Sequence, residues 1–454
     1  MLLVSCYELG HQPLSLASPL AALGEAGFAP RAVDTFVEPL EECAIRDAQL
    51  VAISVPMHTA LRLACGIARR IRPVNPDAHV SFYGLYAWLN AEYLFEAGLA
   101  DSVVGGEFEQ PLVSLAHSIA DGTPAVGVRF PDRYAPPSLA RQTWAVPRRE
   151  SLPSLGRYAH FLRDGERAPA GYVEATRGCK HTCTHCPITP VYGGRFFAVP
   201  REVVLADIRA QIASGARHIT FGDPDFLNGP THSLRIARAM HAEFPDLTFD
   251  ATIKVEHILQ QADVFPELHE LGCAFVVSAV ESLSDTVLDH LRKGHTGSDV
   301  GLALEVMAAA GIPLRPSLVA FTPWTTLEDY LALLHFVQAH ELIDSIDPVQ
   351  YAIRLLIPPG SAVLDDAGAG EWLGELDAAA FSFRWTHPDP RMDQLQAEVN
   401  AIVERGETEE RDAWETFGSI TTASHLAAGI EPVASAPPSA QRRPPPRLTE
   451  TWFC

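Results

Sequence analysis

Short apolar runs alternate with longer amphipathic stretches along most of the first 360 residues. Runs of this length are typical of buried strands, and the stretches between them are long enough for helices. Parallel strands joined by crossover helices are covered on both faces and read as nearly continuous apolar runs. The pattern therefore predicts an α/β protein whose N-terminal part is a small doubly wound domain. The strands expected there are 1–7, 31–36, 50–55, 79–83 and 102–104.

The same alternation resumes at Gly171 and forms six strand–helix units. Six such units predict an open part of a (β/α) barrel, a partial (β/α)6 barrel, in which functional groups lie at the carboxyl ends of the strands. The expected strands are 171–175, 218–221, 248–255, 274–280, 313–321 and 349–356.

Composition divides the rest of the chain. Between the two α/β parts lies a proline-containing segment with little periodicity, and proline and arginine dominate the end of the chain, which predicts an extended, flexible tail. The predicted parts are the doubly wound domain at 1–125, a linker at 126–170, the barrel at 171–360, a mixed helical segment at 361–433 and the proline-rich tail at 434–454.

Charge excludes two classes of partner. The chain has 34 basic and 56 acidic residues, a formal net charge of −22. A nucleic-acid backbone or an anionic membrane surface binds clustered Lys and Arg, so neither is expected as a partner. No apolar run approaches the roughly 20 residues of a membrane helix, and the first residues lack the basic region of a signal peptide. A soluble, cytoplasmic protein is predicted.

Three cysteines follow the first barrel strand with the spacing Cys-x3-Cys-x2-Cys, at Cys179, Cys183 and Cys186. A loop this short can turn three thiolates toward one centre, where they hold three irons of a [4Fe–4S] cluster and leave the fourth iron open. Zinc with His181 or His185 as fourth ligand is one alternative, and buried structural thiols are another. The position at a strand end favours the cluster.

The cysteine motif, its place and the six strand–helix units resemble the radical S-adenosylmethionine (SAM) enzymes over about residues 170–360. The resemblance implies SAM as cofactor, cleavage of one of its C–S bonds by an electron from the cluster, and a flavodoxin- or ferredoxin-type electron donor. It also implies a small-molecule substrate. The residue before the third cysteine is usually aromatic in this family; here it is His185, whose flat ring can lie against adenine.

Five further residues are candidates for holding SAM. Gly222 and Asp223 follow the second strand and resemble the family's Gly-Gly-Glu motif, whose acidic group accepts from the methionyl ammonium; a turn capped by Asp223 is the structural alternative. Ser278 and Glu281 end the fourth strand and resemble the family's ribose contacts; a helix N-cap there is the alternative. Arg315 lies in an apolar strand and needs an anionic partner, either the SAM carboxylate or Asp223 or Glu281.

The N-terminal domain is similar to cobalamin-binding domains, including its closing Gly105-Gly106-Glu107-Phe108-Glu109. Domains that bind cobalt through a protein histidine carry Asp-x-His-x-x-Gly after the first strand. Here His11 has neither the Asp nor the Gly of that motif. Cobalamin is therefore a doubtful cofactor, and the domain is interpreted as a scaffold.

A narrower resemblance is carried by residues 186–196, residues 315–324 and the tail ending in Cys454. These segments are similar to the CUAEP/CCAEP-tail radical SAM (seleno)protein family, which includes enzymes of arsinothricin biosynthesis. The resemblance implies transfer of a 3-amino-3-carboxypropyl group from SAM to trivalent arsenic, with arsenite as a candidate substrate and Cys454 as a catalytic thiol.

Three hypotheses stay open from the sequence. One is this aminocarboxypropyl transfer, for which the chain is expected to be truncated at a UGA codon that encodes a selenocysteine after Cys454. A second is a cobalamin-dependent methylase or an enzyme that forms a 5′-deoxyadenosyl radical. The third is a zinc-stabilised scaffold without catalytic activity.

Overall fold

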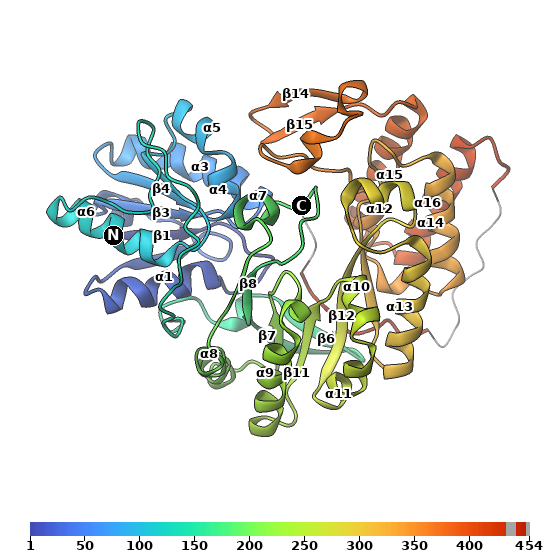
Figure 1. Cartoon of the computed structure of the whole chain (residues 1–454), viewed down its shortest axis with the longest axis horizontal. Helices are drawn as coiled ribbons and strands as arrows, with labels where there is room; N and C mark the ends of the chain where they lie inside the picture. The colour runs from blue at the N-terminus through green and yellow to red at the C-terminus, as the bar shows by residue number, and fades with distance from the viewer. Residues whose placement is uncertain (433–441, 451–454) are drawn as a thin grey trace.

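The computed structural model describes residues 1–432 and 442–450. Its N-terminal part is a five-stranded parallel sheet in the order β2-β1-β3-β4-β5, which confirms the doubly wound prediction (Figure 1). The strands are β1 (Leu2–Ser5), β2 (Arg31–Asp34), β3 (Leu50–Ser54), β4 (His79–Tyr83) and β5 (Ser102–Val104). The helices are α1 (Leu14–Glu25), α2 (Glu42–Arg46), α3 (His58–Val74), α4 (Leu85–Leu89), α5 (Ala91–Glu96) and α6 (Glu109–Asp121).

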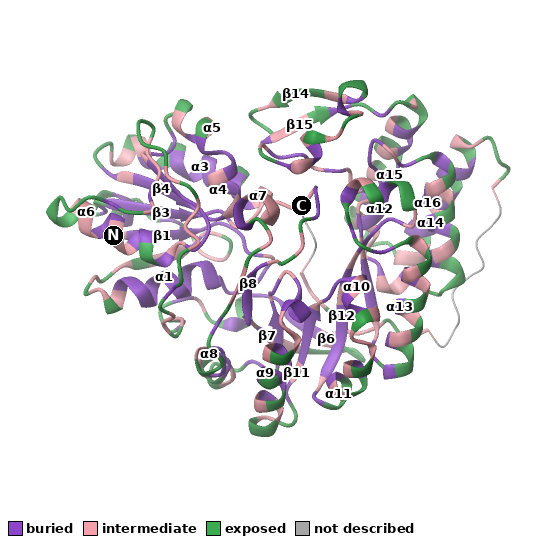
Figure 2. Ribbon diagram, in the orientation of Figure 1, coloured by how far each residue is buried: buried purple, intermediate pink, exposed green. Residues whose placement is uncertain are grey.

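Both faces of this sheet are covered, which is why its strands read as continuous apolar runs. One buried cluster lies under α1 and α6 and includes Leu20 and Leu115. The other lies under α3 and α4 and includes Leu61 and Ala87. The central strand β3 is buried along its whole length (Figure 2).

The second sheet has seven strands in the order β13-β12-β11-β10-β7-β6-β16. Five of them are parallel and form the expected open barrel: β7 (Glu166–Val173), β10 (His218–Phe221), β11 (Thr248–Thr252), β12 (Cys273–Glu281) and β13 (Leu314–Leu318). The helices that follow are α8 (Arg201–Ala213), α9 (Pro230–Glu243), α10 (Val255–Gln260), α11 (Phe265–Glu270), α12 (Asp285–Leu291), α13 (Gly297–Ala310) and α14 (Leu327–Ala339).

The sixth barrel strand, expected over 349–356, is not a strand. Pro348–Ala352 is the 3-10 helix η5, and only Arg354 forms a bridge, to Phe321. Pro348 has no N–H to donate to a ladder, and its fixed φ suits the first turn of a helix. The other 3-10 helices are η1 (Leu155–Arg157), η2 (Phe226–Asn228), η3 (Ala262–Val264), η4 (Ile343–Ser345), η6 (Ala362–Asp365) and η7 (Ala369–Glu371).

The barrel sheet also includes residues from the segment expected to be a linker. β6 (His160–Arg163) pairs antiparallel with β7 through a tight turn at Asp164-Gly165. Both turn residues have positive φ, 50° and 82°. An Asp-Gly pair between strands is the sequence signal of such a hairpin, and the sequence interpretation missed it.

The proline-rich tail is extended, but its described residues pack against the barrel rather than lying free. β16 (Arg447–Leu448) adds an antiparallel strand to β6, and the guanidinium of Arg442 forms ion pairs with Asp344 and Asp412. Cys454 lies outside the described residues.

Residues between the barrel and the tail form a hairpin and two helices. The hairpin is β14 (Leu373–Asp377) with β15 (Ser382–Trp385), followed by α15 (Pro390–Thr408) and α16 (Ala413–Ala427). Phe417 and Ile420 of α16 extend the barrel's buried core. In the described part of the chain, the helices are too short or too polar to cross a membrane.

Candidate functional site

The three motif cysteines lie in one loop at the carboxyl end of β7. The loop is closed by β8 (Thr176–Gly178), which pairs with β9 (Phe196–Ala198), and the short helix α7 (Ile188–Tyr192) lies between the two. Gly178, directly before Cys179, has a φ of +74°, and a Cβ there would lie 2.5 Å from the Tyr192 ring. Only glycine fits this turn, so the loop starts in a defined direction.

The thiols are chemically suited to bind iron. All three cysteines are free; Cys183 is buried and the other two are partly exposed. Burial of the thiol raises the pKa of Cys186 to about 12, and burial also raises the pKa of Cys179. Iron would supply the positive charge that stabilises the thiolates, so the donor set fits a [4Fe–4S] cluster.

The two histidines of the zinc alternative use their Nε2 atoms for other contacts. His185 Nε2 lies 3.3 Å from a carboxylate oxygen of Glu281, and His181 Nε2 lies 3.3 Å from Nε2 of His257. Within the described chain, the buried Nδ1 of His185 has no hydrogen-bond partner.

The segment after β10 forms hydrogen bonds with the chain at the start of the cysteine loop. Asp223 accepts hydrogen bonds from Ala175 N (2.8 Å) and Thr176 Oγ1 (2.6 Å), and burial raises the pKa of Asp223 to about 7. Asn228 Oδ1 accepts from Lys180 N at 3.3 Å and lies 3.6 Å from the Cys179 sulfur. Asp223, predicted as a SAM contact, is thus also a clamp on the chain that leads to the cysteines.

Gly222 is required by packing within the barrel. A Cβ at this position would lie 2.0 Å from the Tyr172 ring carbon that carries its hydroxyl. The close approach at Gly222 is therefore one between β10 and Tyr172 of β7.

Three of the five predicted SAM residues share one cavity. Gly222, Asp223 and Arg315 line a space of about 190 Å³ in the barrel interior. Other polar residues around it are His11, Tyr172, Thr220, Asp250, Thr252, Asp347 and Glu450. Arg315 is a cation in the cavity lining, and several other lining residues carry carboxyl groups. The cavity therefore suits a ligand that has both a positive and a negative group.

Arg315 has a different structural partner from those expected. Its Nη2 donates to Asp347 Oδ1 at 3.2 Å, rather than to Asp223 or Glu281. Among the described residues its buried Nη1 has no hydrogen-bond partner. A buried guanidinium nitrogen without a partner is a ready donor to an anionic ligand.

Glu281 and Ser278 lie outside this cavity lining. Glu281 has a φ of +64° and binds Lys293 Nζ at 3.1 Å, and Lys293 together with His185 holds the pKa of Glu281 well below its usual range. Ser278 is completely buried, and within the described chain its hydroxyl has no partner. Glu281, at the end of the fourth strand, thus contacts both Lys293 and His185 of the cysteine loop, and the sequence interpretation did not assign Lys293 a role.

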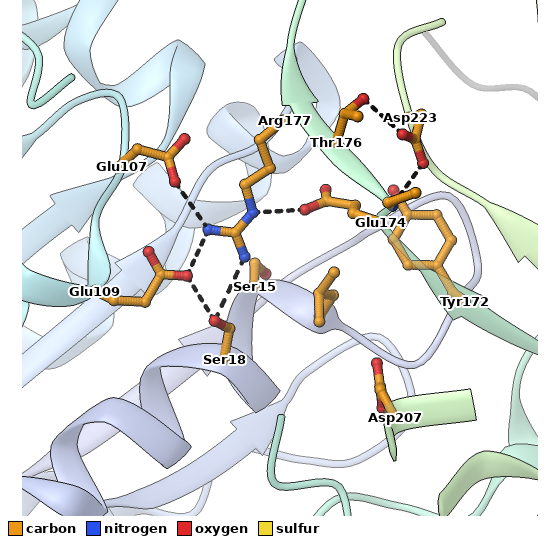
Figure 3. Close-up of polar contacts among 12 residues, drawn as sticks. Ser15, Ser18, Glu107, Glu109, Tyr172, Glu174, Thr176, Arg177, Asp207 and Asp223 are labelled. Carbon is orange, nitrogen blue, oxygen red and sulfur yellow. Dashed lines mark hydrogen bonds and ion pairs between the residues drawn. The ribbon is translucent and has the colours of Figure 1, made fainter. Parts of the chain in front are cut away.

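Arg177 connects the cysteine loop to the N-terminal domain (Figure 3). Its guanidinium pairs with Glu109 at 2.6 Å, Glu174 at 2.7 Å and Glu107 at 3.4 Å. Burial raises the pKa of Glu107 to about 7 in spite of the arginine. Glu107 and Glu109 belong to the closing motif of the N-terminal domain, so that motif binds the barrel directly. The sequence interpretation missed this contact.

Two glycines at the carboxyl edge of the N-terminal sheet are closely packed by the chain itself. A Cβ on Gly105 would lie 2.6 Å from the Trp88 side chain, and one on Gly106 would lie 2.4 Å from Ser138 O. His11, which lines the barrel cavity, is buried, and its Nε2 already pairs with Glu450 at 3.0 Å.

Comparison with known proteins identifies the barrel. Residues 173–337 match the family model of the Radical SAM superfamily. The chain carries a radical SAM domain. The cofactors of this radical SAM domain are accordingly a [4Fe–4S] cluster and SAM.

Among curated relatives, an uncharacterized methyltransferase of Pyrococcus horikoshii is 23% identical over 322 residues, which span 69% of this chain and 68% of that protein. The radical SAM methyltransferase TsrM of Kitasatospora setae, solved with cobalamin and a [4Fe–4S] cluster, is 19% identical with a TM-score of 0.59, over 75% of this chain and 70% of that one. The cobalamin-dependent SAM radical enzyme OxsB is 15% identical with a TM-score of 0.70, over 90% and 66%. These structural likenesses show that the N-terminal domain and the radical SAM domain share the arrangement found in TsrM and OxsB.

Proposed function

We propose that this protein is a group-transfer radical SAM enzyme that acts on a small molecule bound in the barrel cavity. Cys179, Cys183 and Cys186 hold the cluster, and Gly222, Asp223 and Arg315 bind the charged groups of SAM or substrate. When bound, the cluster supplies the electron that cleaves the SAM sulfonium. The observation that carries this proposal is the placement of three free thiols in one glycine-started loop, whose preceding residues bind Asp223 of the charged cavity.

Group transfer is supported by the methyltransferase names of the Pyrococcus relative and of TsrM. Because His11 has neither the Asp nor the Gly of the cobalt-binding motif, no part of the proposal uses a corrinoid. Lys293 and Arg177 act as positioning residues, and neither lines the cavity. Arg177, just before Cys179, pairs with Glu109, and Lys293 pairs with Glu281, which contacts His185 of the cysteine loop. Electrons come from a flavodoxin- or ferredoxin-type donor.

Aminocarboxypropyl transfer to trivalent arsenic is the second candidate. Its support is the family resemblance and one structural observation: Glu450, close to the chain end, lines the same cavity as Gly222 and Asp223. Trivalent arsenic prefers soft thiolate ligands, which makes Cys454 a candidate ligand.

The experiment is anaerobic reconstitution followed by reduction and incubation with SAM. We expect about four irons per chain and a reducible cluster signal in electron paramagnetic resonance. Alanine at Cys179, Cys183 or Cys186 removes both the signal and SAM cleavage, whereas Cys65→Ala, in the buried core of the N-terminal domain, leaves both in place. A Cys183→Ala chain with full iron and activity would refute the proposal.

Mass spectrometry of the SAM products distinguishes the candidates. S-adenosylhomocysteine indicates methyl transfer, and 5′-methylthioadenosine that increases with arsenite indicates aminocarboxypropyl transfer. A dominant 5′-deoxyadenosine product indicates hydrogen abstraction and contradicts group transfer.

A further inference from the structure

The loop between Cys179 and Cys183 carries a histidine that the cluster does not use. His181 lies next to His257, the third residue of α10, with their Nε2 atoms 3.3 Å apart and their rings inclined by 59°. Asp225, which precedes η2, completes the group. The side chains of Asp225 and His257 are 0% and 2% exposed, so the group is closed to bulk water on that side.

Two of the buried atoms in this group lack a hydrogen bond. Asp225 Oδ2 and His257 Nδ1 lie 2.7 Å apart, yet their geometry forms no hydrogen bond, and neither atom has another hydrogen-bond partner among residues 1–432 and 442–450. The other oxygen of Asp225 accepts from Leu227 N at 3.0 Å. The two atoms contact each other as an ion pair without a hydrogen bond of good geometry, so the pair is an incomplete one that a cation could share.

We propose that His181, Asp225 and His257 bind a divalent transition-metal ion at a site separate from the cysteines. One ligand atom from each residue lies within 4.8 Å of those of the other two. Ligand atoms around tetrahedral zinc, each about 2.0–2.1 Å from the metal, are about 3.3 Å apart, so the side chains would close by up to about 1.5 Å around the ion. Two imidazoles and one carboxylate are a donor set of zinc and of non-haem iron(II) sites.

Neighbouring charges support the same ion. Glu256 Oε2 lies 3.6 Å from Nδ1 of His181, on the side of the ring away from His257. An acceptor at the second ring nitrogen fixes the tautomer that presents Nε2 to a metal. Lys254 binds Glu256 at 3.2 Å and neutralises it, so Asp225 is the anionic ligand of the site.

The site joins three parts of the chain: the cysteine loop, the segment after β10 and the helix α10. An ion there would hold His181, and with it the backbone between Cys179 and Cys183, against the barrel. This inference does not depend on which group the enzyme transfers.

The test is equilibrium dialysis of the reconstituted full-length chain against Zn²⁺, with iron and zinc counted together. We expect one zinc per chain while about four irons are retained, because the cysteines are then occupied. Asp225→Asn and His257→Ala weaken zinc binding at least about tenfold, and His340→Ala, an exposed histidine at the end of α14, leaves it unchanged.

A second measurement uses Co²⁺ with a chain in which all three motif cysteines are alanine. Visible d–d absorption without a thiolate charge-transfer band supports the site, and its loss in the near-isosteric Asp225→Asn chain assigns the ligand. Absence of zinc in the wild-type chain, or zinc retained in both Asp225→Asn and His257→Ala, overturns the proposal.

Discussion

At the scale of single residues, burial sets the protonation of acids between the two α/β parts. Glu8 is buried in the loop after β1, where it accepts from Leu14 N at 3.0 Å and from Ser15. Burial raises the pKa of Glu8 to about 7, although these hydrogen bonds favour its charged form. The same cause raises the pKa of Glu107 and of Asp223 to about 7. These carboxyl groups therefore lose their protons near neutral pH, which places negative charge in the interior of the protein.

Glu8 makes stability depend on pH. Between pH 4.5 and about 7 the folded chain keeps a proton that the unfolded chain has lost, so this contribution to the free energy of unfolding is complete below pH 4.5 and disappears as pH rises through 7. We expect Glu8→Gln to remove about 3 kcal/mol from the change in the free energy of unfolding over this pH range, because a pKa difference of one unit corresponds to about 1.4 kcal/mol. Urea unfolding at pH 5 and 7.5 measures it, with the exposed Glu25→Gln as control. Parallel curves for wild type and Glu8→Gln would contradict this.

At the scale of elements, Gly222 allows the carboxyl ends of β7 and β10 to pack closely. Phe221 is paired with Val173, and the next residue, Gly222, donates its N–H to Val173 O at 2.8 Å. The ring of Tyr172 lies over this glycine. The position of the Asp223 clamp, and through it of the cysteine loop, follows from this contact.

Gly222→Ala tests that contact. Its Cβ would overlap the buried Tyr172 ring, so we expect the free energy of unfolding to fall by about 1–3 kcal/mol, the usual cost of overpacking. Gly156→Ala is the control, because a Cβ there meets nothing within 4 Å. Denaturant unfolding of both chains gives the comparison; equal stability would show that Tyr172 moves away without cost.

At the scale of the whole molecule, Arg177 fixes the N-terminal domain to the radical SAM domain. One guanidinium lies among three carboxylates, two from one domain and one from the other (Figure 3). It also lies over the rings of Phe108 and Trp144. Because Arg177 is two residues before Cys179, the same contact orients the cysteine loop.

Arg177→Met should destabilise the protein by about 3–5 kcal/mol, because it leaves buried carboxylates without a cation. Arg177→Lys keeps the charge but loses the geometry of several donors, so we expect an intermediate loss. Thermal unfolding and proteolysis between the domains measure both, with Arg201→Met, on an exposed helix start, as control. An Arg177→Met chain as stable as the control would show that the three acids are neutral.

The N-terminal domain lacks the Asp-x-His-x-x-Gly motif, and His11 Nε2 is paired with Glu450, so we predict that no histidine binds cobalt in this protein. Purification with hydroxocobalamin followed by an optical spectrum is the measurement. We expect the wild-type spectrum to show only the cluster. One bound corrinoid per chain would refute this prediction and favour a cobalamin-dependent methylase.

The sequence by itself determined the two parallel sheets and the cysteine loop, because both are local. Strands buried on both faces must be apolar along their length, and three thiols within eight residues need no distant contact to converge. The prediction of a sixth strand was wrong because Pro348 has no N–H for the strand ladder. The apolar run suggested a strand, and this local effect of proline was not weighed against it.

Only the tertiary structure decided the partners of the charged residues. Arg315 meets Asp347, Arg177 meets Glu107 and Glu109, and the tail strand β16 meets β6, all across separations that leave no periodic pattern in the sequence. An isolated charge in an apolar strand shows that a partner must exist, because an unpaired buried charge is too costly. Which residue is that partner depends on how the sheet twists and curves, and this is a property of the folded chain.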